Sequence, residues 1–76
     1  RTIVLNPSKA GLNLALPDPA NLSPGGPYFF IVNQSTVDTV SINDNAANLV
    51  ATLGTSSSVE IILGLNAMSA KTWYAV

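Results

Sequence analysis

The chain has 76 residues, of which only three are Lys or Arg and four are Asp or Glu, and it contains no Cys and no His. These counts exclude disulfides, thiolate or imidazole catalysis, and zinc sites built from Cys and His. Three cations are too few to neutralise a phosphate backbone, so we expect no nucleic-acid partner. No run of about 20 apolar residues is present, so we expect no membrane span.

The chain is polar without being charged. Asn, Ser and Thr supply 22 of its residues, whereas charged residues make up 9%, against about 25% in a typical soluble domain. Chains below about 70–80 residues commonly need a disulfide, a metal or a partner chain for stability. A disulfide is impossible here and the four acids are scattered along the sequence. We therefore expect a homo-oligomer or a component of an assembly.

The first predicted elements have the period of two that is typical of strands. A short apolar run covers residues 2–5. In residues 12–16 leucine alternates with asparagine or alanine, which indicates a strand with one buried face. Proline and glycine dominate residues 18–27, and because proline has no ladder donor we predict a loop there. The prolines of this loop are Pro19, Pro24 and Pro27.

Five more strands are predicted, separated by turns about every 8–12 residues. The aromatic and β-branched run at residues 28–32 is typical of a central strand, with Phe30 in the core. Residues 72–76 form the last strand, and residues 67–71 have room for one helical turn before it. Alternation predicts shared faces for Val40 with Ile42, for Leu49 with Ala51 and Leu53, and for Val59 with Ile61, Leu63 and Leu65.

These elements predict an all-β fold, a small antiparallel β-sandwich or β-barrel of about seven short strands. We expect residues 1–76 to form a single domain, with residues 1–10 as an extended N-terminal arm. Pro7 ends the first apolar run early, so residues 1–5 are placed to pair with the open sheet edge of a neighbouring subunit.

Three polar patterns have a chemical and a simpler interpretation. Residues 43–45, Asn-Asp-Asn, contain calcium-type ligands, but they lack the EF-hand spacing and are typical of a hairpin turn. The Gly and Ser residues at 54–58 lack the lysine of a phosphate loop and indicate a second hairpin loop. No spacing pairs two of the four acids as glycoside hydrolysis requires. We expect no enzyme activity, no cofactor and no metal.

Aromatic residues near both ends of the predicted sheet have two interpretations. Trp73, Tyr74, Tyr28 and Phe29 are residue types that stack against sugars. One of Trp73 or Tyr74 is more simply explained as a core residue. Aromatic residues are also enriched in protein interfaces, which the composition already favours.

The stretch from residue 28 to residue 74 resembles small all-β modules of tailed-phage virion proteins. It reads Y-F-F-I-V-N-Q-S, then T-V-S-I-N-D-N, then N-L-V-A-T-L-G-T-S-S-S-V-E-I-I-L, and closes on T-W-Y. The upstream L-N-L-A-L-P is similar to the strand that often precedes this pattern. Capsid decoration proteins and tail-fibre or tail-tip domains share this style of sequence, and the likeness covers residues 11–74.

The resemblance implies a capsid decoration, or cement, protein on the virion exterior, without catalysis and usually trimeric. Its partners would be the major capsid protein or another virion protein, bridged by interface burial and strand addition. The alternative is a tail-fibre or tail-tip module that binds a host-surface glycan. The candidate contact residues are Ile3, Val4, Leu5, Pro19, Pro24, Pro27, Trp73 and Tyr74.

Overall fold

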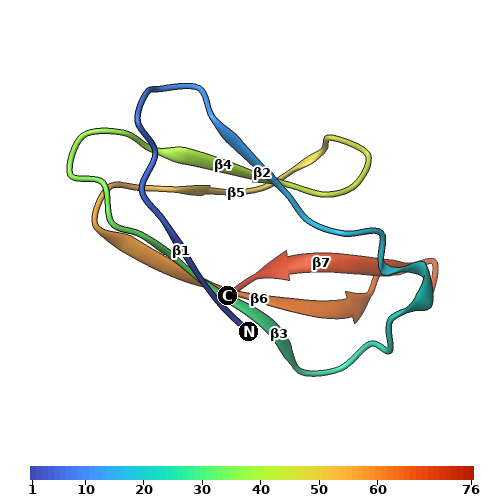
Figure 1. Cartoon of the computed structure of the whole chain (residues 1–76). Helices are drawn as coiled ribbons and strands as arrows, with labels where there is room; N and C mark the ends of the chain where they lie inside the picture. The colour runs from blue at the N-terminus through green and yellow to red at the C-terminus, as the bar shows by residue number, and fades with distance from the viewer.

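The computed structural model describes all of residues 1–76 and contains seven strands and one short 3₁₀ helix, η1 (Pro19–Asn21) (Figure 1). All seven predicted strands are present. The helical turn predicted for residues 67–71 is absent: residues 67–69 form a tight turn with Ser69 in the left-handed region, and Lys71 already belongs to the last strand. The strands are β1 (Thr2–Leu5), β2 (Asn13–Ala15), β3 (Pro27–Asn33), β4 (Val40–Asn43), β5 (Leu49–Leu53), β6 (Ser57–Leu65) and β7 (Lys71–Ala75).

The strands form two sheets that pack face to face as a sandwich. One sheet has four strands in the order β1-β3-β6-β7, and the other has three in the order β2-β4-β5. Figure 1 shows the two layers, with the chain crossing from one to the other between β1 and β2. The all-β fold predicted from the sequence is confirmed, and of its two forms the sandwich is the one present, since the sheets do not close into a barrel.

Pairing within the sheets is mixed, which corrects the purely antiparallel prediction. β1 runs parallel to β3 and β2 runs parallel to β4, whereas the other three pairs are antiparallel. The alternation in residues 2–16 reports only which side chains are buried and carries no information about strand direction. Because the chain changes sheet after β1, the first two strands cannot form a hairpin with each other, and each adds to a later strand.

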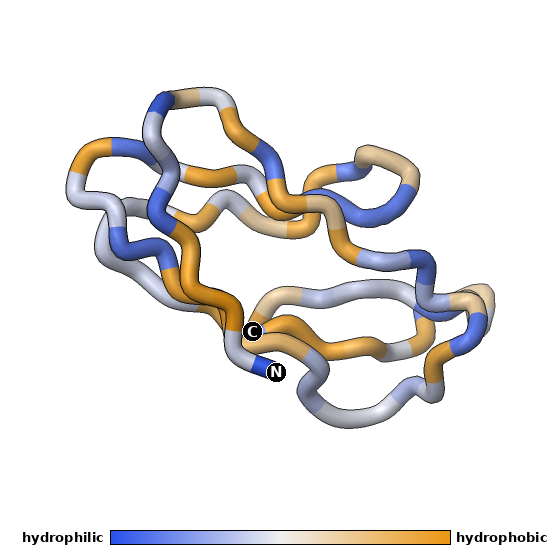
Figure 2. The backbone as a smooth tube through the Cα atoms, viewed as in Figure 1, coloured by the Kyte–Doolittle hydropathy of each residue, from blue (hydrophilic) through white to orange (hydrophobic).

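The core lies between the sheets and is small. The face prediction for β4 is confirmed, and that for β6 holds for its two central residues. Figure 2 shows hydrophobic residues following one another along β1 and alternating with polar ones in the three-stranded sheet. The buried hydrophobic side chains are Leu16, Ile31, Val40, Ile42, Leu53, Ile61, Leu63 and Trp73.

A β-bulge in β5 overturns one predicted face. Between its partners Ile42 and Asn43, β4 advances by one residue, while β5 advances by two, from Ala51 to Leu49. Val50 is therefore the extra residue, and it packs against the core. A slip of one residue exchanges the two faces of a strand. Leu49 is consequently 63% exposed, and the prediction that it shares the buried face is wrong.

A second bulge, in β3, builds an aromatic cluster around Trp73. The register shifts between Pro27 and Phe29, which makes Tyr28 the extra residue. Two consecutive aromatic side chains can therefore both reach Trp73. The ring centroids of Tyr28 and Phe29 each lie 5.6 Å from that of the indole, with Tyr28 in an edge-on arrangement. Such pairs contribute about 0.5–1.5 kcal/mol beyond the area they bury.

Asn33, at the end of β3, is fully buried and joins three segments. Its side-chain amide donates to the carbonyls of Asp38 and Gly54, at 2.9 and 3.1 Å. Its side-chain oxygen accepts from the Ser35 backbone N–H at 3.0 Å. The Ser35 hydroxyl in turn accepts from the backbone of Val37 and Asp38. Asn33 therefore fixes the loop between β3 and β4 against the end of β5.

We expect Asn33→Ala to lower the free energy of unfolding by about 2–4 kcal/mol, because it leaves buried backbone groups without partners. Asn66→Ala is the matched control. The Asn66 side chain also accepts from two backbone N–H groups, of Met68 and Ala70, but it is exposed. Water can replace it there, so about 1 kcal/mol or less is expected. Urea unfolding followed by Trp73 fluorescence measures both, and equal losses would contradict the role of Asn33.

Candidate functional site

The first candidate contact segment belongs to the sandwich. Residues 2–5 form β1, an edge strand paired with β3 of the same chain, so the predicted N-terminal arm is not a detached segment here. Ile3 and Leu5 face inward and pack against the core. Val4 points to the opposite face and is 54% exposed. Of the three, only Val4 presents its side chain on the outside of the sheet.

The second candidate segment, the proline-rich loop, is hydrogen-bonded to β7. The Trp73 indole donates to the Pro17 carbonyl at 2.9 Å, and the Lys71 ammonium donates to the Ala20 carbonyl at 2.8 Å. Pro19 is buried at the start of η1, where its fixed φ suits the first helical position. The prediction that Pro19 is a contact residue is therefore wrong, because its side chain lies inside the protein. Pro24 and Pro27 are exposed.

The two C-terminal candidates, Trp73 and Tyr74, lie on opposite sides of β7. Trp73 is only 4% exposed, so it is a core residue and is dropped as a surface contact. Tyr74 points the other way and is 39% exposed. A further aromatic residue, Phe30, is predicted to be a core side chain, but it is 44% exposed and the prediction is wrong. Phe30 lies between Phe29 and Ile31, whose side chains face the core, so alternation along β3 directs it outward.

Val4, Phe30 and Tyr74 lie on one surface, which we call the outer face of the four-stranded sheet. In the register of the sheet, Phe30 lies opposite Glu60 on β6, and Ile62 lies opposite Tyr74 on β7. Glu60 is the only charged side chain that these strands direct to this face, since Lys71 of β7 lies on the side of Trp73 and bonds to Ala20. A flat apolar area of this kind is typical of a contact surface. Its apolar members are Val4, Phe30, Val32, Ile62, Tyr74 and Val76.

Gly64 sets the position of Tyr74 on the outer face. A Cβ at Gly64 would lie 3.2 and 3.3 Å from two carbons of the Tyr74 ring. The ring therefore covers the glycine, a way in which sheets compensate for a missing side chain. The contact holds the ring flat against β6 and leaves its other side toward solvent.

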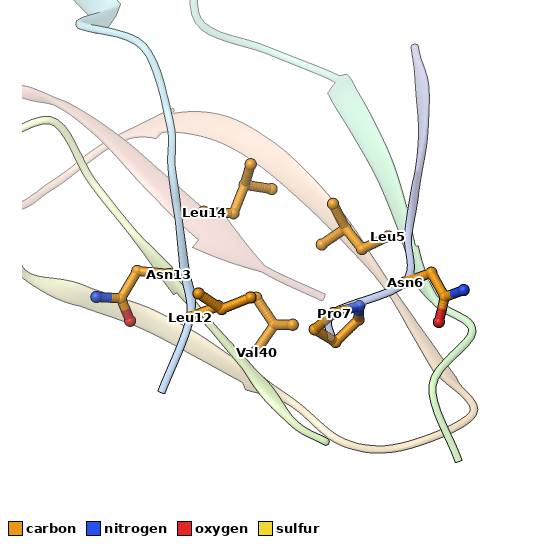
Figure 3. Close-up of a pocket in the computed structure, with 7 residues that line it drawn as sticks. All are labelled: Leu5, Asn6, Pro7, Leu12, Asn13, Leu14 and Val40. Atoms are coloured by element: carbon orange, nitrogen blue, oxygen red, sulfur yellow. The ribbon is translucent and has the colours of Figure 1, made fainter. Parts of the chain in front are cut away.

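A second feature lies on the open side of the sandwich, where β1 and β2 face each other across what we call the β1–β2 groove. Two hollows, of about 210 and 300 Å³, lie along it and share Leu14. In Figure 3, Leu12, Val40 and Pro7 meet at one end of the first hollow, while the amides of Asn6 and Asn13 point outward. The second hollow is lined by Arg1, Ile3, Leu14, Ala15, Leu16, Pro17 and Phe29.

Asp44 is used to build a turn. Its carboxylate accepts from the backbone N–H groups of Ala46 and Asn48, both at 2.9 Å, and from the Asn48 side chain at 3.2 Å. The backbone N–H of Asn48 has the largest effect and lowers the pKa of Asp44; desolvation raises it, and the Ala46 N–H and the Asn48 side chain lower it further, so the net shift is downward. The hairpin turn predicted for residues 43–45 is confirmed. No three acidic side chains converge as a metal site would require.

No helix in the structure is long and apolar enough to cross a membrane. The chain matches no protein-family model, no curated protein and no solved structure. The outer face and the β1–β2 groove are therefore interpreted from their own geometry.

Sequence reasoning found Val4 and Tyr74 but missed the surface that they share with Phe30. The signal was available in part, because Thr2, Val4, Phe30 and Tyr74 occupy the alternate positions that the inward residues leave over. The groove had no such signal. The groove forms because β1 and β2 pair with later strands in two different sheets. A local sequence pattern does not specify which strands pair.

We expect the Asp44 carboxyl to titrate below its ordinary pKa. Because the folded pKa is depressed, the stabilisation is complete above the unfolded value, about 3.9, and is lost as the pH falls through the folded pKa. A carboxyl-detected NMR titration gives the pKa directly. Asp44→Asn should remove this contribution to the pH dependence of unfolding, and an Asp44 pKa at or above the ordinary value would contradict the turn geometry.

Proposed function

We propose that the chain is a structural module of a tailed-phage virion, a capsid decoration protein that cements the shell by bridging neighbouring capsid subunits. The observation that carries the proposal is the exposed apolar outer face, with Val4, Phe30 and Tyr74 on three of the four strands of one sheet. A surface of this composition favours burial against another protein. The resemblance of residues 11–74 to such virion modules supports the same role.

The surface chemistry suits a cement. Only seven side chains carry charge, whereas Asn, Ser and Thr are abundant. Neutral polar groups lose less hydration energy than charges when a contact forms, so a broad face can be covered at small desolvation cost. A protein that binds the assembled lattice in preference to free subunits stabilises the lattice by mass action. No reactive group is needed for this role.

We propose a homotrimer whose subunits associate through the outer face. Only eight hydrophobic side chains are buried in the single chain, which is a small core for 76 residues. Covering the outer face would remove Val4, Phe30 and Tyr74 from water and add to that core. Three linked copies would also bind a repeating shell more tightly than one, because the second and third contacts become intramolecular.

A second candidate role is a tail-fibre or tail-tip module that binds a host-surface glycan. One observation favours it: the Tyr74 ring covers Gly64 and stays 39% exposed, and a second exposed aromatic, Phe30, lies on the same face of the sheet. Aromatic faces stack on the apolar faces of sugars. This role places the same surface against a carbohydrate in place of protein.

We expect Phe30→Lys to weaken binding to assembled capsid shells by at least about tenfold, because it puts a charge at the centre of the face that the trimer buries, and a single chain lacks the linked second and third contacts. The fold should survive, since the ammonium lies opposite Glu60 across the β3–β6 pair. Met68→Lys is the matched control, since Met68 is exposed in the turn before β7, away from this face. Co-sedimentation with shells measures both. Undiminished binding of Phe30→Lys, or equal loss with the control, would refute the role of the outer face.

The glycan role gives a different pattern. If the surface binds sugar, Tyr74→Ala should abolish glycan-array signals, and Gly64→Ala should reduce them because the added methyl displaces the ring. Neither change should affect the backbone pairing of β6 and β7. An array without any signal for the wild-type chain would remove this candidate and leave the decoration role.

A further inference from the structure

The four sheet edges of the sandwich are not equivalent. β7 is covered by the proline-rich loop, through Trp73 to Pro17 and Lys71 to Ala20. β5 carries the bulge at Val50, which interrupts its edge. β1 and β2 have neither protection, and they flank the β1–β2 groove. Unprotected edges with apolar side chains are where another strand can add.

The free backbone groups of β1 can be assigned. Phe30 donates to the Arg1 carbonyl and Gln34 donates to the Leu5 carbonyl, both at 2.8 Å. In a ladder, alternate residues bond to one neighbour, so the residues between them, Thr2 and Val4, turn their N–H and C=O groups to the open side. Outside the ladder no hydrogen bond reaches Thr2 or Val4. The edge therefore offers two donor–acceptor pairs, two residues apart.

The hollows of the groove have the same spacing as these edge groups. One hollow lies beside Leu5 and the other beside Ile3, and Leu14 of β2 contributes to both. A strand added to β1 would direct every second side chain inward, about 6.5–7 Å apart. Each hollow is at or below the lower end of the range for small-molecule sites, about 300–1,000 Å³. Two such hollows in series fit successive side chains of a polypeptide better than one compact ligand.

One end of the β1–β2 groove is positively charged. Arg1 is the only charged residue that lines either hollow, and it lies at the β1 N-terminal end. A segment that pairs antiparallel with β1 would place its carboxyl-terminal end beside Arg1. A carboxylate there would be complementary to the guanidinium, whereas charge further along would face only apolar and amide groups.

We propose that the edge of β1 binds an extended, apolar segment of another polypeptide by antiparallel strand addition. Two alternate side chains of that segment fill the hollows of the β1–β2 groove, and a carboxylate at its end lies beside Arg1. The four-stranded sheet becomes five-stranded in the complex. This site is separate from the outer face. Its test uses the isolated chain and no shell, so the result does not depend on whether the virion role is correct.

The probe is an acetylated hexapeptide of alternating valine and threonine with a free terminal carboxylate. NMR titration of the labelled chain should give saturable shifts at Thr2 and Val4 and slowed exchange of their amide protons. The same peptide with an amidated end should bind about two- to fivefold more weakly, because it lacks the partner of Arg1. A peptide N-methylated at every second amide, on the edge that would face β1, should not bind.

Substitutions on the chain distinguish the two open edges. Val4→Pro removes one edge donor and should abolish peptide binding, since proline is tolerated on an edge strand whose N–H faces outward. Val4→Thr keeps the donor and should bind normally. Amide exchange in the same titration tests β2, whose hydrogen bonds to β4 use the Leu12 carbonyl and the Leu16 N–H. The N–H groups of Asn13 and Ala15 therefore lie on the open edge of β2, and their exchange should stay unchanged when the peptide binds.

Three results would overturn the proposal. The first is the absence of saturable shifts up to about 1 mM peptide. The second is shifts confined to Phe30 and Tyr74, which would place the peptide on the outer face. The third is slowed exchange of the Asn13 and Ala15 amide protons in place of those of Thr2 and Val4, which would assign the site to β2. If Val4→Pro fails to fold, the N-methylated peptide decides alone, and its binding at full strength would overturn the proposal.

Discussion

The Trp73 indole is the contact on which the arrangement of this small sandwich depends. It lies on β7, at the edge of the four-stranded sheet, and packs against Tyr28 and Phe29 of β3. Its N–H bonds to the Pro17 carbonyl, in the segment that leads out of β2 in the other sheet. One side chain thus joins β7 and β3 of the four-stranded sheet to the segment that leaves the other sheet. With so few buried side chains, a single large aromatic supplies much of the packing.

That arrangement decides which surfaces remain for other molecules. The loop that meets Trp73 also covers β7, so this edge is closed, and the bulge at Val50 interrupts β5. β1 and β2 stay open because each adds in parallel to a later strand and has nothing on its other side. The inward residues of the four-stranded sheet enter the core, and the alternate positions place Phe30 and Tyr74 on its outer face. The face proposed for self-association and the edge proposed for strand addition therefore both follow from the way the two sheets pack.

The strands were predictable and their neighbours were not. Apolar runs and period-two alternation located all seven strands, and alternation placed Val40 and Ile42 correctly. The aromatic residue type placed Phe30 in the core, whereas it points outward between the inward Phe29 and Ile31. Alternation failed at Leu49, where an inserted residue exchanges the faces. Bulges depend on the partner strand, so a local pattern cannot reveal them. The same limit applies to the parallel pairing of β1 and to the groove, which arise from contacts between residues far apart in sequence. Trp73 and Tyr74 were both proposed as contacts, and only their opposite sides of β7 separate core from surface.

The central claim is that the outer face is an interface that this chain covers by association with its own copies. The most direct test is the absolute mass of the isolated chain by light scattering across a dilution series, for the wild type and for Phe30→Lys. The account predicts a wild-type mass near three times 7.9 kDa and a single-chain mass for the variant. A wild-type chain that is folded and monomeric at every concentration would contradict it.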